Sequence, residues 1–363
     1  MGKHILDGYA SAVRTEAGKP FTINGMHMWR RRLWTISKAA LAVAIVVGVA
    51  RQFVQLLGDG NWSGLAGLPH WQTVVGVGLL YLAAHTSWGS FWVLLLREQG
   101  IAIGWYAGLR CYFVSQFGKY LPGKAWVIFL RVGMLQPLGA PGVAVAVTAT
   151  YETLASMGAG ALVAVVCLPW LDLLPVAVAG RWGWFVVLAG LPVAIGLMHR
   201  VVQVWLRRRG ADLSRLASAP GWLLLARGLL HGLTGWLLLA CSLWLLLNEL
   251  LGGAWSLSFS YYPALLGALA LAYVAGFVVL VAPGGLGVRE WVLLQTLRPL
   301  VPESETAAAV LAALTALWLR LIWTVAEVSA AALLYICRPA ISTITTNNPA
   351  VQLPSLSHGA RRS

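Results

Sequence analysis

Long apolar stretches dominate the pattern of hydrophobic and polar positions along the chain. A helix needs roughly 20 apolar residues to cross the hydrocarbon core of a bilayer. Six stretches of about that length predict full membrane spans, near residues 35–57, 71–96, 143–170, 181–199, 222–248 and 305–336. Two more, 105–134 and 262–300, are apolar but are interrupted in the middle by proline and glycine. Each of these two broken segments therefore predicts a pair of shorter helices rather than one straight span.

The charges between the apolar stretches predict the orientation of the spans. Lys and Arg gather in the N-terminal segment 1–38, in the loop 199–221 and in the C-terminal tail, whereas the loops 58–70 and 171–180 hold one acid each. Because Lys and Arg favour cytoplasmic loops, both termini are expected in the cytoplasm. Three spans separate the two broken segments, so these enter the membrane from opposite faces. That layout predicts an inverted-topology repeat, in which a pair of broken helices marks the transport site.

Composition supports a membrane protein and excludes several other classes. Of the 363 residues, 59% are hydrophobic and only 10% are charged, against roughly 25% charged in soluble proteins. Such a chain is neither a soluble enzyme, nor a disulfide scaffold, nor disordered. The net charge of +14 does not indicate nucleic acid as a partner, because the chain has no polar domain with a basic face. The four cysteines lie in or beside apolar runs without metal-ligand spacing, so no cofactor and no metal site is expected.

These patterns together predict an all-α polytopic membrane protein with about six full spans and two re-entrant hairpins, broken by Pro and Gly, in an inverted repeat. The alternative is that each broken segment makes two full crossings. The expected organisation is a cytoplasmic N-terminal segment over 1–34, a membrane domain over 35–337 and a disordered cytoplasmic tail over 338–363.

The first broken segment is centred on the sequence Gly-Lys-Tyr-Leu-Pro-Gly-Lys-Ala-Trp at 118–126. Pro122 and Gly123 end one helix and allow another to begin. Lys119 and Lys124 flank this turn, and a lysine is a flexible point charge suited to phosphate. The amides at the start of the second helix favour an anion as well. The alternative is a turn at the cytoplasmic surface whose lysines reach into lipid headgroups.

The second broken segment contains Pro-Gly-Gly-Leu-Gly-Val-Arg-Glu at 283–290. Its turn is formed by Pro283, Gly284, Gly285 and Gly287. Arg289 and Glu290 follow at once, between apolar runs. Charges at membrane depth are costly, are usually paired and mark pathways. The alternative is a turn near the outer surface whose two charges are solvated.

Three further ionisable residues interrupt predicted spans: Glu152, Arg320 and Glu327. Arg320 and Glu327 are seven residues apart and lie on nearly the same helix face. Structural pairing between helices is one explanation, with Arg320 neutralising Glu290, Glu152 or Glu327. The functional explanation is an anion site in which carboxylates hold the cations in place or exchange protons. The turn residues and charges of both broken segments, together with Glu152 and Arg320, are therefore the candidate substrate-binding residues, and we expect no catalytic residues.

The two motifs together resemble those of the transmembrane, flippase-like family of lysylphosphatidylglycerol synthases. The resemblance covers roughly residues 35–337, with Glu152 after the first motif and Arg320 after the second. It implies a bundle with re-entrant helices that moves lipids between leaflets, and it assigns function to both motifs. We expect a stand-alone membrane member, because the aminoacyl-transferase domain of the two-domain members is missing.

The expected function is that of a multi-pass protein of the inner (plasma) membrane that transports an anionic, phosphate-containing lipid. The lipid is either a phospholipid or one linked to polyprenyl phosphate. One alternative is a membrane-embedded enzyme that acts on a polyprenyl phosphate through Glu152 or Glu290. Another is an accessory subunit in a lipid-modifying or glycan-assembly pathway, with a glycosyltransferase or other lipid-modifying enzyme as its partner. An enzymatic activity is the less favoured hypothesis, because no catalytic motif stands out, and the oligomeric state is left open.

Overall fold

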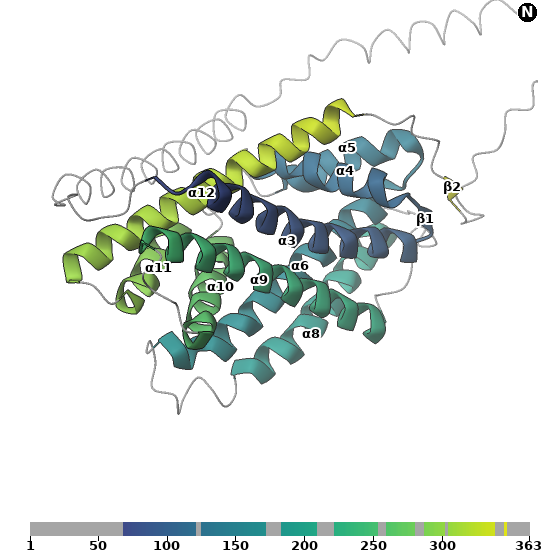
Figure 1. Cartoon of the computed structure of the whole chain (residues 1–363). Coiled ribbons are helices and arrows are strands. Elements are labelled where there is room, and N and C mark those ends of the chain that lie inside the picture. The colour runs from purple at the N-terminus through teal and green to yellow at the C-terminus, as the bar shows by residue number, and fades with distance from the viewer. Residues whose placement is uncertain are drawn as a thin grey trace, which may run out of the picture.

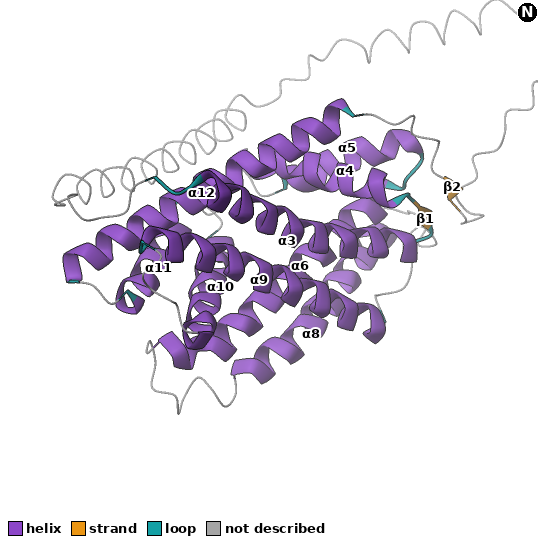
Figure 2. Cartoon of the chain, viewed as in Figure 1, coloured by secondary structure: helices purple, strands orange, loops and turns teal. Residues whose placement is uncertain are grey.

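The computed structural model describes residues 68–120, 125–171, 183–208, 221–252, 259–279, 287–301, 304–337 and 345–346. The predicted span 35–57 and six of the predicted turn residues lie outside this set: Pro122, Gly123, Lys124, Pro283, Gly284 and Gly285. Within the described residues the chain is a bundle of helices, with one pair of very short strands (Figure 1; Figure 2).

Four helices of the described part are long and apolar enough to cross a membrane. They are α3 (Trp71–Glu98), α6 (Gly142–Cys167), α9 (Trp222–Leu250) and α12 (Glu305–Ile336). Each coincides within a few residues with a predicted span, which confirms the expectation of an all-α membrane protein. A helix satisfies its own backbone hydrogen bonds, so apolar length alone is enough to predict such spans. The predicted span 181–199 is covered by α8 (Gly183–Arg208), which continues as far as Arg208.

Both broken segments form two helices each, as their proline and glycine residues predict. The first consists of α4 (Trp105–Ser115), the 3-10 helix η1 (Gln116–Tyr120) and α5 (Trp126–Leu135). The second consists of α10 (Tyr262–Val278) and α11 (Val288–Leu297). At about 1.5 Å per residue, α4, α5 and α11 each rise only about 15 Å. None of them alone crosses a hydrocarbon core of roughly 30 Å.

Short elements complete the described chain. The 3-10 helices are η2 (Gln136–Leu138), η3 (Leu168–Leu171), η5 (Phe259–Tyr261) and η7 (Arg298–Leu300). Strand β1 (Ile101–Ala102) pairs in antiparallel fashion with β2 (Thr345–Thr346). The second strand belongs to the tail that the sequence predicts to be disordered, so two residues of that tail lie against the loop between α3 and α4.

The helices pack in a reciprocal pattern. At the centre, α3 packs against α9. We call α3 to α6 the first half of the bundle and α9 to α12 the second half. The first helix of each broken segment packs against the last long helix of the other half, because α4 contacts α12 and α10 contacts α6. The second helix of each segment packs within its own half, since α5 contacts α6 and α11 contacts α12. Helix α12 therefore touches both broken segments (Figure 1).

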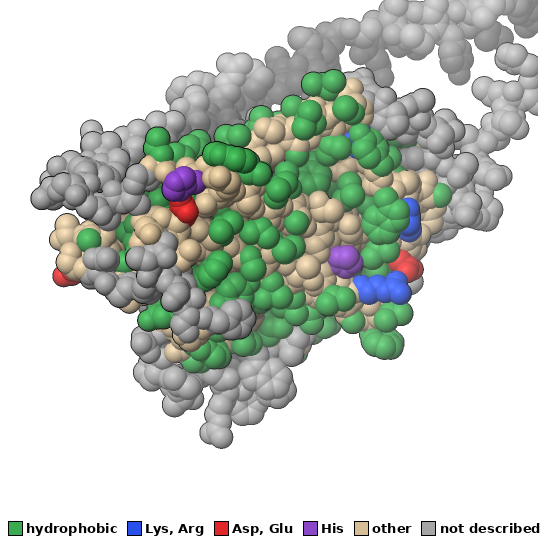
Figure 3. All heavy atoms as spheres, viewed as in Figure 1, with side chains coloured by type: hydrophobic (Ala, Val, Ile, Leu, Met, Phe, Trp, Pro, Cys, Tyr) green, Lys and Arg blue, Asp and Glu red, His purple; other side chains and the backbone are tan. Residues whose placement is uncertain are grey.

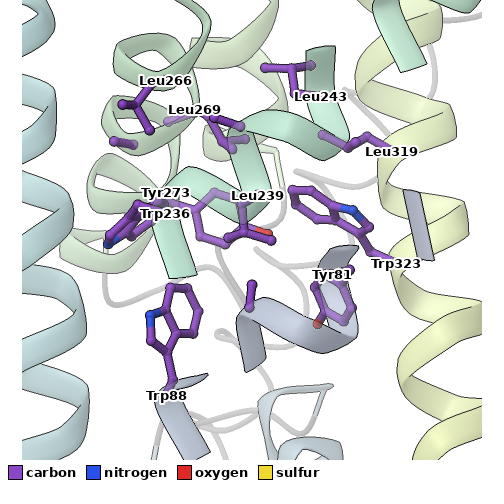
Figure 4. Close-up of a cluster of buried hydrophobic side chains, with 14 of the residues drawn as sticks. Tyr81, Trp88, Trp236, Leu239, Leu243, Leu266, Leu269, Tyr273, Leu319 and Trp323 are labelled. Atoms are coloured by element: carbon purple, nitrogen blue, oxygen red, sulfur yellow. The ribbon is translucent and has the colours of Figure 1, made fainter. Parts of the chain in front are cut away.

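An aromatic chain forms the centre of the core and links four helices (Figure 4). Trp88 of α3 lies 5.5 Å from Trp236 of α9, and Trp236 lies 5.5 Å from Tyr273 of α10, measured between ring centroids. Tyr273 is 5.9 Å from Trp323 of α12, which stacks on Tyr81 of α3 at 5.2 Å. Such ring pairs stabilise a fold beyond the area that they bury. The chain of rings therefore holds α3, α9, α10 and α12 together beside the charged residues described below.

The outer surface of the described helices is apolar. Hydrophobic side chains cover much of the face shown in Figure 3, and the few charged ones lie near its two ends. Exposed examples on the long helices are Leu79, Leu230 and Val325. A large exposed apolar surface marks contact with lipid or with another protein, and its position on membrane-length helices favours lipid.

Three glycines on one face of α9 allow close helix packing. A Cβ atom added at Gly228 would meet Phe91, one at Gly232 would meet Ala159, and one at Gly235 would overlap the indole of Trp88. Small residues at these positions let helix backbones approach each other, as is usual in membrane bundles.

We expect Gly235→Ala to destabilise the protein by about 1–3 kcal/mol, because overpacking forces the buried Trp88 indole to shift. Thermal unfolding of the purified protein in detergent would measure the effect. Gly190→Ala on α8 is the matched control, since a Cβ there meets no atom of the described residues within 4 Å. Equal unfolding temperatures for the two variants would contradict the close packing at Gly235.

Candidate functional site

The charged residues of both broken segments converge on one face of α12. Lys119, from the first segment, forms an ion pair with Glu327. Glu290, from the second segment, forms an ion pair with Arg320, with 2.6 Å between Oε1 and Nη1. Arg320 and Glu327 are two helical turns apart, so both project from the same side of α12. Helix α12 thus places the basic Arg320 beside the second segment and the acidic Glu327 beside the first.

The pair between Lys119 and Glu327 includes a tyrosine hydroxyl. The Tyr81 Oη of α3 donates to Glu327 Oε2 at 2.8 Å, and Lys119 Nζ donates to the same Oη at 3.2 Å. Only 2% of the Glu327 side chain is exposed. A buried carboxylate is tolerated when a counter-charge and hydrogen bonds surround it, and here α3 and η1 supply both.

Glu290 has two structural partners. Its Oε1 accepts from Arg320, and its Oε2 accepts from the backbone N–H of Gly287 at 2.7 Å. Gly287 has φ +86°, a left-handed conformation that glycine adopts without steric cost. The carboxylate therefore caps the first turn of α11 and ties that turn to α12, which explains why the motif has glycine and glutamate three residues apart.

Arg289 differs from Lys119 and Arg320 in its partners. Its guanidinium lies over the Tyr273 ring, with 3.4 Å from Cζ to the ring centroid. Within the described part of the chain it has no carboxylate partner, and its buried Nε has no hydrogen-bond acceptor. The indole Nε1 of Trp323 is also buried without an acceptor there. Buried donors without partners are rare and need an explanation such as an absent ligand or water.

These groups surround a cavity of about 40 Å³ inside the bundle. Its lining includes three cationic side chains, Lys119, Arg289 and Arg320, and two carboxylates, Glu290 and Glu327. The remaining lining side chains are aromatic, aliphatic or hydroxylic: Tyr81, Leu269, Tyr273, Leu293, Ala316, Leu319, Trp323 and Thr324. A small cavity with an excess of positive charge and free donors is chemically suited to an anion.

A second buried ion pair lies apart from this cavity. Arg131 of α5 binds Glu152 of α6 with 3.0 Å between Nη1 and Oε2, and both residues are almost fully buried. The Arg131 guanidinium lies 4.4 Å from the Trp92 ring centroid and 4.6 Å from that of Tyr112. Its Nε donates to Ser115 Oγ at 3.2 Å. Every side of this cation is therefore occupied by the protein, and the pair joins the first broken segment to α6.

The structure thus brings together Lys119, Arg289, Glu290 and Arg320 of the predicted site, with Gly287 as a cap beside them. Glu152 lies in the separate pair with Arg131. Of the three acids considered for Arg320, it is Glu290 that binds it. Sequence reasoning missed Tyr81, Tyr273 and Trp323. The position of Trp323, three residues after Arg320 and four before Glu327, signals the same helix face, whereas the two tyrosines carry no such signal.

The residues that the structure describes contain no group of three or more His, Cys, Asp or Glu side chains able to hold a metal ion. The chain matches no protein-family model and none of the curated proteins to which it was compared. Its function is therefore inferred from the site.

Proposed function

We propose that the protein is an integral inner-membrane transporter that binds an anionic, phosphate-containing lipid and moves it between the leaflets. The observation that carries this proposal is the cavity where the two broken segments meet α12, lined by three cations and only two carboxylates. Charge inside a membrane protein is costly and is retained mainly where a pathway or a binding site requires it. An anion supplies the missing negative charge.

The architecture supports transport. The segments' helices α4, α5 and α11 are too short to cross the bilayer alone, as re-entrant hairpins require. Their reciprocal packing, α4 on α12 and α10 on α6, is the pattern expected of an inverted repeat. Transporters with such repeats bind substrate between broken helices near the midplane. These features agree with the resemblance to the flippase-like family.

The ion pairs suggest how binding is coupled to movement. Without lipid, Glu327 and Glu290 neutralise Lys119 and Arg320 and so tie both broken segments to α12. A phosphate bound in the same cavity repels these two carboxylates and attracts their cations, and so weakens both ion pairs. A ligand shifts a conformational equilibrium only through such a difference in its interactions with the two states. Binding therefore loosens the attachment of the segments to α12 and favours reorientation.

The geometry gives less support to catalysis. Glu152 and Glu290 are the two carboxylates on which the enzyme alternative depends. Glu152 is buried against Arg131, and both oxygens of Glu290 already accept hydrogen bonds, from Arg320 and from Gly287. Glu152 therefore lies away from the cavity, and Glu290, which lines it, is held as an ion-pair partner and helix cap.

The test is lipid movement in proteoliposomes that contain phosphatidylglycerol labelled with a fluorophore on its acyl chain. We expect wild-type protein to equilibrate the label between leaflets, as measured by quenching from outside. Arg320→Gln should slow this by about tenfold or more, because it leaves the Glu290 carboxylate uncompensated beside the incoming phosphate. The control is Arg227→Gln, which removes an exposed arginine of α9. A wild-type rate equal to that of empty liposomes would refute the proposed function.

A further inference from the structure

We infer that the group held in this cavity is the phosphodiester of a lipid headgroup with one net negative charge, and that Arg289 and Trp323 are its anchoring donors. This inference rests on the proposed function, because it names the substrate class of the same site. It assigns Lys119 and Arg320 a different role, in the ion pairs that bind the segments to α12.

The first argument is the charge of the described lining. Lys119 is paired with Glu327 and Arg320 with Glu290, so these four charges cancel. Arg289 remains, which gives the lining a net charge of +1. One negative charge neutralises it, as a phosphodiester does. A zwitterionic headgroup would leave the net charge of +1 uncompensated. A phosphomonoester with two negative charges would give the occupied cavity a net charge of −1. In a low-dielectric interior, uncompensated charge is strongly disfavoured.

The second argument is the pair of donors that lack acceptors. Only 6% of Trp323 is exposed, and its Nε1 is buried without an acceptor in the described ranges. The Nε of Arg289 is also buried without an acceptor in these ranges, and both side chains line the cavity. Leaving one buried donor unsatisfied costs about 1–3 kcal/mol. A phosphodiester has two non-bridging oxygens, so a single bound group supplies an acceptor for each of the two donors.

The volume of the cavity also favours a phosphate group. A cavity of about 40 Å³ holds roughly three oxygen-sized groups, at about 10–15 Å³ for each. The phosphorus and the two non-bridging oxygens of a phosphodiester fit this volume, and an acyl chain does not. The chains must lie outside the cavity, where the surface of the long helices is apolar (Figure 3). A water-soluble phosphodiester has the same anchoring chemistry but lacks these chains, so we expect it to bind more weakly.

The test is calorimetric titration of the full-length protein in detergent with short-chain lipids. The probes are dihexanoyl phosphatidylglycerol, phosphatidylcholine and phosphatidic acid, and water-soluble glycerophosphoglycerol. We expect phosphatidylglycerol to bind about tenfold more tightly than phosphatidylcholine, as for one well-placed charged contact. It should also bind more tightly than phosphatidic acid. Glycerophosphoglycerol should compete for the same site with lower affinity.

Two variants test the anchoring donors. Arg289→Gln should lower the affinity for phosphatidylglycerol by about tenfold and leave that for phosphatidylcholine unchanged. Trp323→Phe keeps a ring but removes the indole N–H, and should lower the affinity by about threefold to tenfold, as for loss of one hydrogen bond. Arg227→Gln is the matched control, with wild-type affinity. Thermal unfolding in the same detergent identifies a variant that has lost its fold, and Trp323→Phe then carries the test.

Several results would overturn the inference. Equal affinities for phosphatidylglycerol and phosphatidylcholine, or tighter binding of phosphatidic acid, would exclude a singly charged phosphodiester. Glycerophosphoglycerol binding as tightly as the lipid would exclude a lipid headgroup. Wild-type affinity in both Arg289→Gln and Trp323→Phe would exclude these two side chains as anchoring donors. If the protein still moves phosphatidylglycerol in liposomes, the proposed function survives that result. Conversely, selective binding without movement would refute the proposed function and leave the anchoring site in place.

Discussion

Replacing Glu152 with alanine is expected to destabilise the protein by about 3–5 kcal/mol, since this is the cost of leaving one partner of a buried ion pair uncompensated. Arg131 is only 1% exposed, and its other neighbours are the Ser115 hydroxyl and the rings of Trp92 and Tyr112. Without Glu152, neither water nor another carboxylate of the described residues compensates this charge. The same replacement removes the ion pair between α5 and α6, so it weakens the attachment of the first broken segment to its own half.

Unfolding of the purified protein by denaturant or heat in detergent would measure this loss. The double replacement of Arg131 and Glu152 by methionine removes both charges and should recover most of the stability, because an apolar pair of similar volume often replaces a buried ion pair without loss. Glu305→Ala is the matched control. Its pair with Arg298 is largely exposed, and exposed pairs contribute less than about 1 kcal/mol. If Glu152→Ala costs no more than Glu305→Ala, the structural role assigned to this pair is wrong.

Replacing Glu327 with glutamine is expected to have the opposite effects on lipid binding and lipid movement. The amide keeps an oxygen that accepts from the Tyr81 hydroxyl but no longer neutralises Lys119. The cavity then carries a further uncompensated cation, and a bound phosphate no longer meets the negative charge of Glu327. We expect the affinity for phosphatidylglycerol to rise by about tenfold, since close charge pairs couple by about 1.5 kcal/mol or more. Movement between leaflets should fall by about the same factor, because release requires the carboxylate to displace the lipid.

Two measurements on the same preparation would check this expectation. Calorimetric titration gives the affinity, and the proteoliposome assay gives the rate of movement. Glu249→Gln is the control, because Glu249 pairs with the exposed His70 at the end of α9, away from the cavity. A loss of both affinity and movement in Glu327→Gln would show that the carboxylate supports binding rather than competing with the lipid.

The two broken segments are held by similar ion pairs, as the predicted inverted repeat would require. In the first half, a base on α5 meets an acid on α6, and in the second half an acid on α11 meets a base on α12. Both pairs attach the second helix of a broken segment to the long helix that follows it. Only the second pair borders the cavity. Both halves thus have the same kind of attachment, and of these two pairs it is the one in the second half that lines the cavity.

The sequence by itself determined the helices and their interruptions. Apolar length alone predicts α3, α6, α9 and α12, because a membrane-spanning helix satisfies its backbone within the segment. Proline and glycine predict the divisions between α4 and α5 and between α10 and α11, because their backbone limits act locally. The candidate charges could be recognised too, since a charge in an apolar stretch is conspicuous wherever the chain places it.

Only the tertiary structure decided which of these charges meet. Lys119 and Glu327 are 208 residues apart in sequence, and no local rule predicts that pair. Glu152 is a candidate by sequence, yet the packing of α5 against α6 gives it Arg131 as a partner and keeps it out of the cavity. In the sequence, Tyr81 and Tyr273 do not differ from the other aromatic residues, and only the packing of α3 and α10 against α12 places them beside these charges. Pairing and enclosure depend on which helices share an interface, and that is a property of the folded bundle rather than of any one segment.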